Sequence, residues 1–228
     1  SVGGAFETAG RQKITPPDPE IPQDTEAAAF FDVDNTLIQG SSLILLAQGL
    51  FKKRFITLSE LAPALRKQIR YRVSGSENAD DIAEGREQAL AVVKGKSVAE
   101  LKQACREIVD NRMLEKSYAD TIELAAMHLA AGQQVWLVSA TPVQIGQALA
   151  ETLGFTGALG TVAEEKDGKF TGRLVGDILH GPGKKHAVAA LAALQQLDLS
   201  KCTAYSDSIN DLPMLEMVGS PVAINPDR

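Results

Sequence analysis

The chain has 228 residues, of which 44% are hydrophobic and 23% charged, as in an ordinary globular protein with a sizeable core. Its formal net charge of -6 argues against a nucleic-acid partner, and no apolar run approaches the roughly 18 residues of a membrane-spanning helix. The two cysteines, Cys105 and Cys202, lack the spacing of a metal site. We expect two free thiols and therefore a reducing, cytoplasmic location.

The N-terminal 26 residues are rich in proline between Pro16 and Pro22 and poor in large apolar residues. This composition predicts a flexible tail, with a short docking peptide as the alternative. The chain begins at Ser1 with no signal-peptide pattern, and it ends at Arg228 soon after the last predicted strand. Whether further segments precede or follow it is left open.

A buried strand is predicted from Ala27 to Phe31, where an apolar run is bounded by polar residues. Asp32 and Asp34 follow it. Because residues i and i+2 share one face of a strand, the two carboxylates would lie side by side if the extended geometry continued. Two carboxylates that close require a cation between them or a proton on one of them.

The region from residue 39 to 114 predicts a small bundle of helices with no strand. The expected helices cover residues 41–51, 57–71, 78–94 and 97–112. Thr57 with Glu60, and Ser97 with Glu100, have the spacing of capping boxes. Lysines and arginines gather in this region, which indicates a solvated helix face or, alternatively, a rim that attracts anionic substrates.

From Tyr118 onward, helices and strands alternate, as in a parallel sheet covered on both faces. The expected helices cover residues 119–131, 141–153, 181–197 and 211–218. The expected strands cover residues 134–138, 202–205 and 221–224, with a hairpin around Asp167-Gly168. Thr141 is the expected N-cap of its helix, with Pro142 at the first helical position. The predicted fold class is therefore α/β, with a Rossmann-like parallel-sheet core (residues 27–38 and 115–228) and an inserted helical cap (39–114).

Polar residues follow three of the predicted strands, at the sheet edge where parallel α/β proteins bind ligands. They are Asp32 with Asp34, Ser139-Ala140-Thr141, and Ser206 to Asp211. Converging carboxylates suit a hard cation such as Mg²⁺, and a hydroxyl at a helix N-terminus suits a phosphate. Lys184, after Gly181-Pro182-Gly183, offers a positive charge, with Lys185 as the alternative.

These segments resemble, in order and spacing, the four motifs of haloacid-dehalogenase-type (HAD) hydrolases. The matching residues are Asp32-Val33-Asp34-Asn35-Thr36, Ser139, Lys184 and Asp207-Ser208-Ile209-Asn210-Asp211. The helical insertion directly after the first motif is similar to that of the phosphoserine-phosphatase-like branch. The resemblance extends from Ala27 to the end of the chain.

The resemblance implies an Mg²⁺-dependent phosphomonoesterase that acts on a small phosphorylated metabolite through an aspartyl-phosphate. It implies Asp32 as the nucleophile and Asp34 as the general acid and base. The implied metal ligands are Asp32, the backbone carbonyl of Asp34, and Asp207. The implied phosphate-binding residues are Ser139, Ala140, Lys184 and Asn210. Asp211 is expected to position a metal-bound water or to hold Lys184.

The substrate is the point at which the chain departs from its branch. Phosphoserine phosphatases carry a Glu that binds the substrate amino group, and its position here is Ser41. Their cap Arg matches the stretch near Ala89, where the nearest arginine is Arg86. Both departures count against phosphoserine, although a phosphoserine phosphatase proper stays an alternative. A catalytically weak phosphate-binding or regulatory protein, or a phosphotransferase, would also fit these motifs. The oligomeric state is left open.

Overall fold

The computed structural model describes residues 24–60 and 87–225. Predictions for the tail up to residue 23, and for the parts of the two middle cap helices between residues 61 and 86, lie outside this range, as does Arg86. The backbone is helical at 58–60 and at 87–93, where the described chain borders these segments. Within the described residues, no helix has the length and apolar character needed to cross a membrane.

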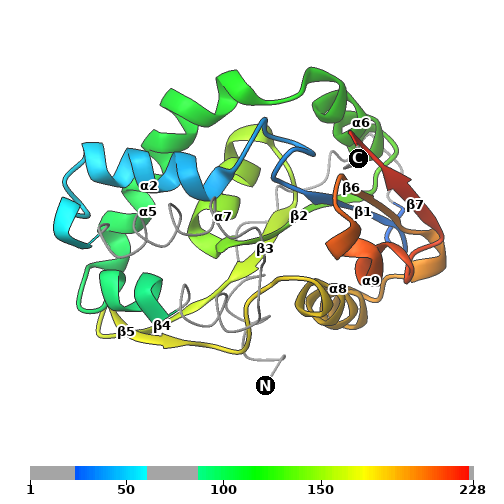
Figure 1. Ribbon diagram of the computed structural model, residues 1–228. Coiled ribbons are helices and arrows are strands. Elements are labelled where there is room, and N and C mark those ends of the chain that lie inside the picture. Colours follow the sequence, from blue (N-terminus) through cyan, green and yellow to red (C-terminus); the bar gives the residue numbers. More distant parts are fainter. Residues whose placement is uncertain (1–23, 61–86, 226–228) are drawn as a thin grey trace.

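Among the described residues the core is a five-stranded parallel sheet with the strand order β3-β2-β1-β6-β7, which confirms the predicted α/β class (Figure 1). Its strands are β1 (Ala28–Asp32), β2 (Gln134–Pro142), β3 (Gly157–Thr161), β6 (Thr203–Ser206) and β7 (Ser220–Ala223). The edge strand β3 was not predicted, because Gly-Ala-Leu-Gly-Thr lacks strand propensity. Gly157 is needed there, since a Cβ atom at this position would lie 2.6 Å from the Trp136 ring.

The α-helices follow the predicted order with shifted ends. Those with both ends in the described part of the chain are α2 (Ser42–Lys52), α5 (Val98–Ile108), α6 (Ala119–Ala130), α7 (Val143–Leu153), α8 (Pro182–Gln195) and α9 (Leu212–Leu215). The predicted helix to residue 112 ends as α-helix at Ile108 and continues as a π-helix, Val109–Met113. The predicted helix over 211–218 is instead a 3₁₀ turn, Ile209–Asp211, followed by the four residues of α9.

The predicted N-cap role of Thr141 is wrong. Strand β2 continues to Pro142, which is itself the N-cap residue of α7 and makes no side-chain cap hydrogen bond. The strand is extended here because Pro142 pairs with Thr161 of β3, after a shift in register. Tertiary pairing with a neighbouring strand therefore overrides the local capping pattern.

The sheet separates two hydrophobic clusters, because side chains of β1 point alternately to its two faces. Ala29 and Phe31 belong to the cluster that also contains α5 and α7 side chains. Ala28 and Phe30 belong to the cluster that contains side chains of α8 and α9. Both faces are therefore covered, as a parallel sheet requires.

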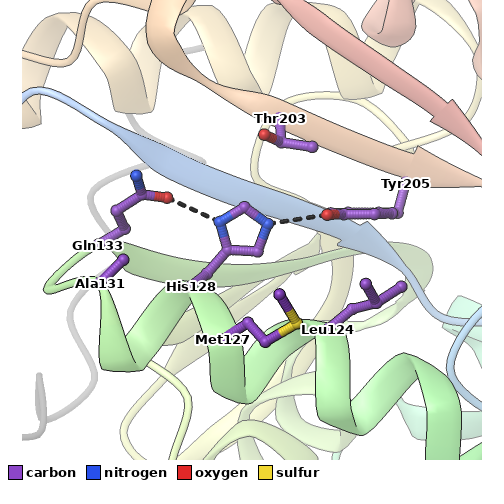
Figure 2. Close-up of a pocket in the computed structure, with 7 residues that line it drawn as sticks. All are labelled: Leu124, Met127, His128, Ala131, Gln133, Thr203 and Tyr205. Carbon is purple, nitrogen blue, oxygen red and sulfur yellow. Dashed lines mark hydrogen bonds between the residues drawn. The ribbon is translucent and has the colours of Figure 1, made fainter.

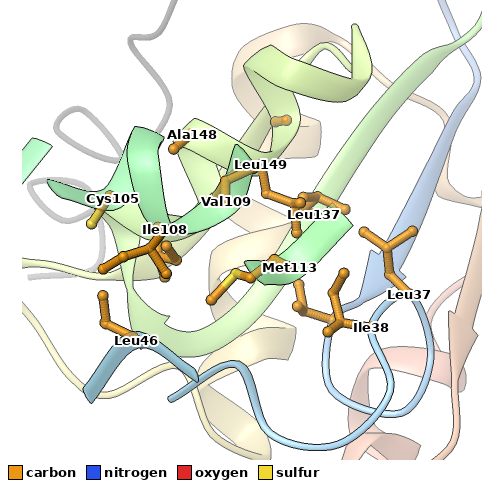
Figure 3. Packing of buried hydrophobic residues seen from close by; sticks show 14 of the residues in the cluster. Leu37, Ile38, Leu46, Cys105, Ile108, Val109, Met113, Leu137, Ala148 and Leu149 are labelled. Carbon is orange, nitrogen blue, oxygen red and sulfur yellow. The ribbon is translucent and has the colours of Figure 1, made fainter. Parts of the chain in front are cut away.

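Side chains of helices α2 and α5 belong to the first of these clusters, in which they pack together with side chains of the sheet (Figure 3). Leu46 of α2, together with Cys105 and Ile108 of α5, lies in the same cluster as Leu137 of β2 and Leu149 of α7. The described helices of the 39–114 region thus share a continuous apolar core with the sheet. The division of the chain into core and cap stays a prediction.

The predicted hairpin is present as β4 (Ala163–Lys166) and β5 (Lys169–Leu174). Asp167 and Gly168 both have positive φ, at 51° and 75°, as a tight two-residue turn requires. Two backbone hydrogen bonds join Phe170 of this hairpin to the segment before α5. The Gly95 N–H donates to the Phe170 carbonyl oxygen, and the Phe170 N–H donates to the Lys96 carbonyl oxygen. In Figure 1 the hairpin lies beneath α5.

Candidate active site

Asp32 is the last residue of β1, and the chain turns immediately after it. The backbone N–H groups of Leu37 and Ile38 both donate to the carbonyl oxygen of Val33, at 3.0 and 2.9 Å. The strand geometry therefore does not continue to Asp34, so the shared-face relation expected for an extended chain does not apply. Asp32 is 6% exposed, whereas Asp34 is only partly buried in the turn.

Lys184 brings two of the predicted acids together. Its Nζ atom lies 2.5 Å from Oδ1 of Asp32 and 2.7 Å from Oδ2 of Asp211. Lys184 is 5% exposed, whereas Lys185 is exposed, so the geometry selects Lys184 from the two candidates. The start of α8, which carries Lys184, lies very close to the backbone of Ile178. This approach requires Gly183, because a Cβ atom there would lie 2.3 Å from the carbonyl oxygen of Ile178.

Burial and charge act against each other in this ion pair. Burial raises the pKa of the Asp32 carboxyl to about 7, against the opposing effect of the Lys184 ammonium. Burial acts to lower the pKa of Lys184, but the Asp32 and Asp211 carboxylates together outweigh it and raise that pKa. A further cation beside Asp32 would favour its ionised form.

Thr36 links Asp32 to Asp207, a connection that the spacing of the motifs does not predict. Its Oγ1 atom lies 3.4 Å from Oδ2 of Asp32 and 3.5 Å from Oδ1 of Asp207, and it accepts a hydrogen bond from the Asp207 N–H at 3.0 Å. One hydroxyl thus contacts both carboxylates that were predicted to bind Mg²⁺. The position of Thr36 in the first motif was its only sequence signal.

This donor set fits Mg²⁺. No three His, Cys, Asp or Glu side chains in the described part of the chain are grouped so as to hold a metal ion. Mg²⁺ does not need such a cage, because it is commonly bound by one or two carboxylates and keeps several waters. The carboxylates of Asp32 and Asp207, which share the Thr36 hydroxyl, would be oxygen ligands of this kind.

Asp211 is fixed on two sides. Besides the Lys184 contact, its Oδ2 atom accepts a hydrogen bond of 2.7 Å from the hydroxyl of Ser206, the last residue of β6. Of the two predicted tasks of Asp211, the geometry thus matches that of holding Lys184. Asn210 is exposed beside this group, and its backbone N–H bonds to the Ser208 hydroxyl at 3.2 Å.

Ser139 lies in the second half of β2 and directly follows Val138, which pairs with Asp32. Its hydroxyl is 2.8 Å from that of Thr141 and accepts the Thr141 N–H at 3.2 Å. The carbonyl of the adjacent Ala140 accepts a hydrogen bond of 2.7 Å from Thr161 on β3. Both predicted phosphate-binding residues of β2 are therefore at the same sheet edge as Asp32.

A pocket lies away from this group of residues, between α6 and β6 (Figure 2). It is lined by Leu124, Met127, His128, Ala131, Gln133, Thr203 and Tyr205. Both ring nitrogens of His128 are hydrogen-bonded, to Gln133 at 2.7 Å and to Tyr205 at 2.8 Å. Thr203 begins β6 and Gln133 precedes β2, so the pocket is near the amino ends of these strands and none of the predicted site residues lines it.

The chain is similar to known proteins over most of its length. The family model described as haloacid dehalogenase-like hydrolase matches residues 29–216. A Mycobacterium tuberculosis protein named phosphoserine phosphatase SerB1 is 54% identical over 92% of this chain and 68% of its own length. A Neisseria meningitidis protein named histidinol-phosphatase is 31% identical over 87% of this chain and 90% of its own. A solved structure of a Bordetella pertussis protein of unknown function, 28% identical, superposes with a TM-score of 0.76 over 89% of this chain and 91% of that chain.

The chain therefore belongs to the haloacid dehalogenase-like hydrolase family. Within that family it is a phosphoric monoester hydrolase of the phosphoserine-phosphatase-like branch.

Proposed function

We propose that the protein is an Mg²⁺-dependent phosphatase of small phosphorylated metabolites that works through an aspartyl-phosphate on Asp32. The observation that carries the proposal is the position of Asp32. It ends β1, is almost fully buried, pairs with Lys184, and shares the Thr36 hydroxyl with Asp207. A nucleophilic carboxylate flanked by a cation and a second acid suits attack on a phosphate ester.

Asp32, Asp207 and the backbone carbonyl of Asp34 would hold the Mg²⁺ ion. The ion would lower the repulsion between the nucleophile and the phosphate dianion, which is roughly 4 kcal/mol per unit-charge pair at ~4 Å and an effective dielectric near 20. Lys184, which pairs with Asp32, would also lower this repulsion. Ser139, the backbone at Ala140, and Asn210 would orient the phosphoryl oxygens in this mechanism.

The proposed reaction has two steps. Asp32 first forms a bond to phosphorus while the bond to the leaving oxygen breaks, and Asp34 gives its proton to that oxygen. Asp34 then takes a proton from a water whose oxygen attacks the aspartyl-phosphate. This second attack releases inorganic phosphate and restores Asp32. Asp211 keeps Lys184 in place throughout.

The substrate class is the broader part of the proposal. A relative named phosphoserine phosphatase and a relative named histidinol-phosphatase are both more than 30% identical to the chain. The likeness therefore supports phosphomonoesters as the substrate class without selecting a particular ester. Ser41, the N-cap of α2, has no charge to pair with a substrate amino group. We propose the 39–114 region as the cap that selects the ester. We also propose a cytoplasmic location, which is supported by two buried, free cysteines.

The test is phosphate release from p-nitrophenyl phosphate in Mg²⁺. Asp32→Asn is expected to lower kcat by at least about a thousandfold, because no nucleophile remains. Asp120→Asn, at an exposed acid of α6, is the matched control and is expected to keep full activity. A wild-type protein that is inactive on amino-acid, sugar, nucleotide and lipid phosphates would contradict the proposal. Product formation that depends on an acceptor other than water would identify the phosphotransferase alternative.

A further inference from the structure

Asp34 is held by the first residue of helix α2. The backbone N–H of Ser42 donates to Oδ1 of Asp34 at 2.9 Å, and the Ser42 hydroxyl donates to the same oxygen. Ser42 is 1% exposed, so both donors are shielded from water. Within residues 24–60 and 87–225 no other group donates to this carboxylate, so its second oxygen, Oδ2, accepts no hydrogen bond from this part of the chain.

The Ser42 hydroxyl is not needed to cap the helix. The N-cap residue is Ser41, whose side chain accepts the Ile44 N–H at 3.4 Å. Ser42 follows it as the first helical residue, and its hydroxyl points to another segment of the chain. The free N–H groups of a helix N-terminus carry partial positive charge, which adds to the attraction for a carboxylate.

The backbone around Asp34 does not fix its side chain by strand geometry, because β1 ends two residues earlier. The turn that follows contains Asn35 at a positive φ of 53°. A carboxylate on such a turn has several accessible rotamers unless a partner selects one. Ser42, with two donors on one oxygen, is that partner.

We propose that Ser42 is a positioning residue that directs Oδ2 of Asp34 toward the leaving oxygen of the substrate. The inference rests on the proposed function, in which Asp34 is the general acid. Proton transfer requires about 2.6–3.2 Å between the carboxyl oxygen of the acid and the leaving oxygen. A carboxyl group rotated away from this position can no longer donate its proton. Through this contact the orientation of α2 controls the acid.

The choice of leaving group makes the proposal measurable. An alkoxide is a poor leaving group and depends on the proton from Asp34, whereas p-nitrophenolate leaves readily without it. Comparing kcat/KM for glycerol 2-phosphate with kcat/KM for p-nitrophenyl phosphate therefore isolates the acid step. The ratio is insensitive to a general loss of folded protein, which lowers both values equally.

Ser42→Ala is expected to lower kcat/KM for glycerol 2-phosphate by about 10- to 100-fold, a part of the 10²–10⁴-fold that general acid catalysis supplies. For p-nitrophenyl phosphate the expected change is less than about threefold, since the acid contributes little there. Ser42→Thr keeps a hydroxyl and is expected to restore the ratio. Ser97→Ala removes the N-cap hydroxyl of α5, which accepts the Glu100 N–H and does not contact Asp34, so this matched control is expected to leave the ratio unchanged.

A double-mutant cycle separates positioning from structure. In an Asp34→Asn background, Ser42→Ala is expected to have no further effect on glycerol 2-phosphate, because the acid that it positions is gone. Equal losses on both substrates, or the same loss in the Asp34→Asn background, would overturn the role of Ser42. Ser42→Cys, similar in volume but a weak donor, replaces Ser42→Ala if that variant does not fold. Failure of the wild type on both substrates would instead reject the proposed function.

Discussion

Lys184 on α8 contacts Asp32 at the end of β1 with a 2.5 Å ion pair, although 152 positions separate the two residues in the chain. The same ammonium group lies 2.7 Å from Asp211. A cation between two buried carboxylates relieves the repulsion that the acids at this sheet edge would otherwise produce. The protein therefore supplies part of the charge balance of its site from its own side chains.

The first prediction concerns this cation. Lys184→Met leaves Asp32 and Asp211 buried without their shared partner, which is expected to lower the free energy of unfolding by roughly 3 kcal/mol or more. It is also expected to lower kcat/KM for p-nitrophenyl phosphate by at least about a hundredfold, since the proposed mechanism assigns Lys184 to the phosphoryl group. Urea unfolding and initial-rate kinetics measure the two effects.

Lys185→Met provides the matched control, because Lys185 is the exposed neighbour on the same helix turn. Its unfolding free energy is expected to change by less than about 0.5 kcal/mol, with unaltered kinetics. Similar losses in both variants would contradict the assignment of Lys184.

The second prediction concerns pH. In the metal-free protein the Asp32 carboxyl has a pKa of about 7, whereas an unfolded aspartate releases its proton near pH ~4. The native state therefore binds more protons between these values, and the contribution of Asp32 to stability is complete below pH ~4 and lost as the pH rises through about 7. The loss is at most about 1.4 kcal/mol per pH unit.

Asp32→Asn removes this titrating group, so urea unfolding of both proteins in EDTA isolates its contribution. From pH 5 to pH 7.5 the wild type is expected to lose stability relative to the variant. Lys184 stays protonated across this window because its pKa is raised, so it does not contribute to the difference. A wild type that gains stability relative to Asp32→Asn over this range would show that the sign is wrong.

The third prediction concerns Thr36, which contacts the carboxylates of Asp32 and Asp207. Thr36→Val keeps the side-chain shape and removes the hydroxyl. The Mg²⁺ concentration for half-maximal activity is expected to rise about tenfold or more, as for other groups that orient metal ligands. Stability is expected to fall by about 1–3 kcal/mol, because the Asp207 N–H loses its acceptor.

Thr121→Val is the control for this effect. Its hydroxyl is equally buried and donates to the carbonyl oxygen of Thr36 at 2.8 Å, but it touches neither carboxylate. The same substitution there is expected to cost stability without changing the Mg²⁺ requirement. If Thr36→Val and Thr121→Val shift the Mg²⁺ dependence alike, the Thr36 hydroxyl has no special role.

The fourth prediction concerns the packing of α2 on α5. A Cβ atom on Gly49 would lie 2.4 Å from Cγ1 of Ile108. Gly49→Ala is therefore expected to destabilise the protein by about 1–3 kcal/mol through overpacking, partly offset by about 1 kcal/mol of helix propensity. In an Ile108→Ala background, which removes the clash, adding Gly49→Ala is expected to leave the stability of the single variant unchanged or to increase it. Thermal unfolding of the four proteins of this cycle gives the coupling, and additive effects would exclude the contact.

Local sequence patterns indicate much of the site. The strand that ends in Asp32 is recognisable from its apolar run, and the Asp167-Gly168 hairpin from its turn residues. Both signals depend on neighbours in the chain. The prediction of Thr141 as an N-cap is wrong for the same reason, since its capping pattern is local whereas the pairing of Pro142 with Thr161 is not.

Residue type and spacing along the chain were enough to predict the α/β alternation, the family motifs and the acids at the strand ends. Only the tertiary structure distinguished Lys184 from Lys185, since burial against Asp32 and Asp211 decides between adjacent lysines. It alone joined Ser42 to Asp34 and showed that two carboxylates near in sequence have different partners. The physical reason is that such hydrogen bonds and ion pairs depend on how helices pack against the sheet, which no single segment encodes.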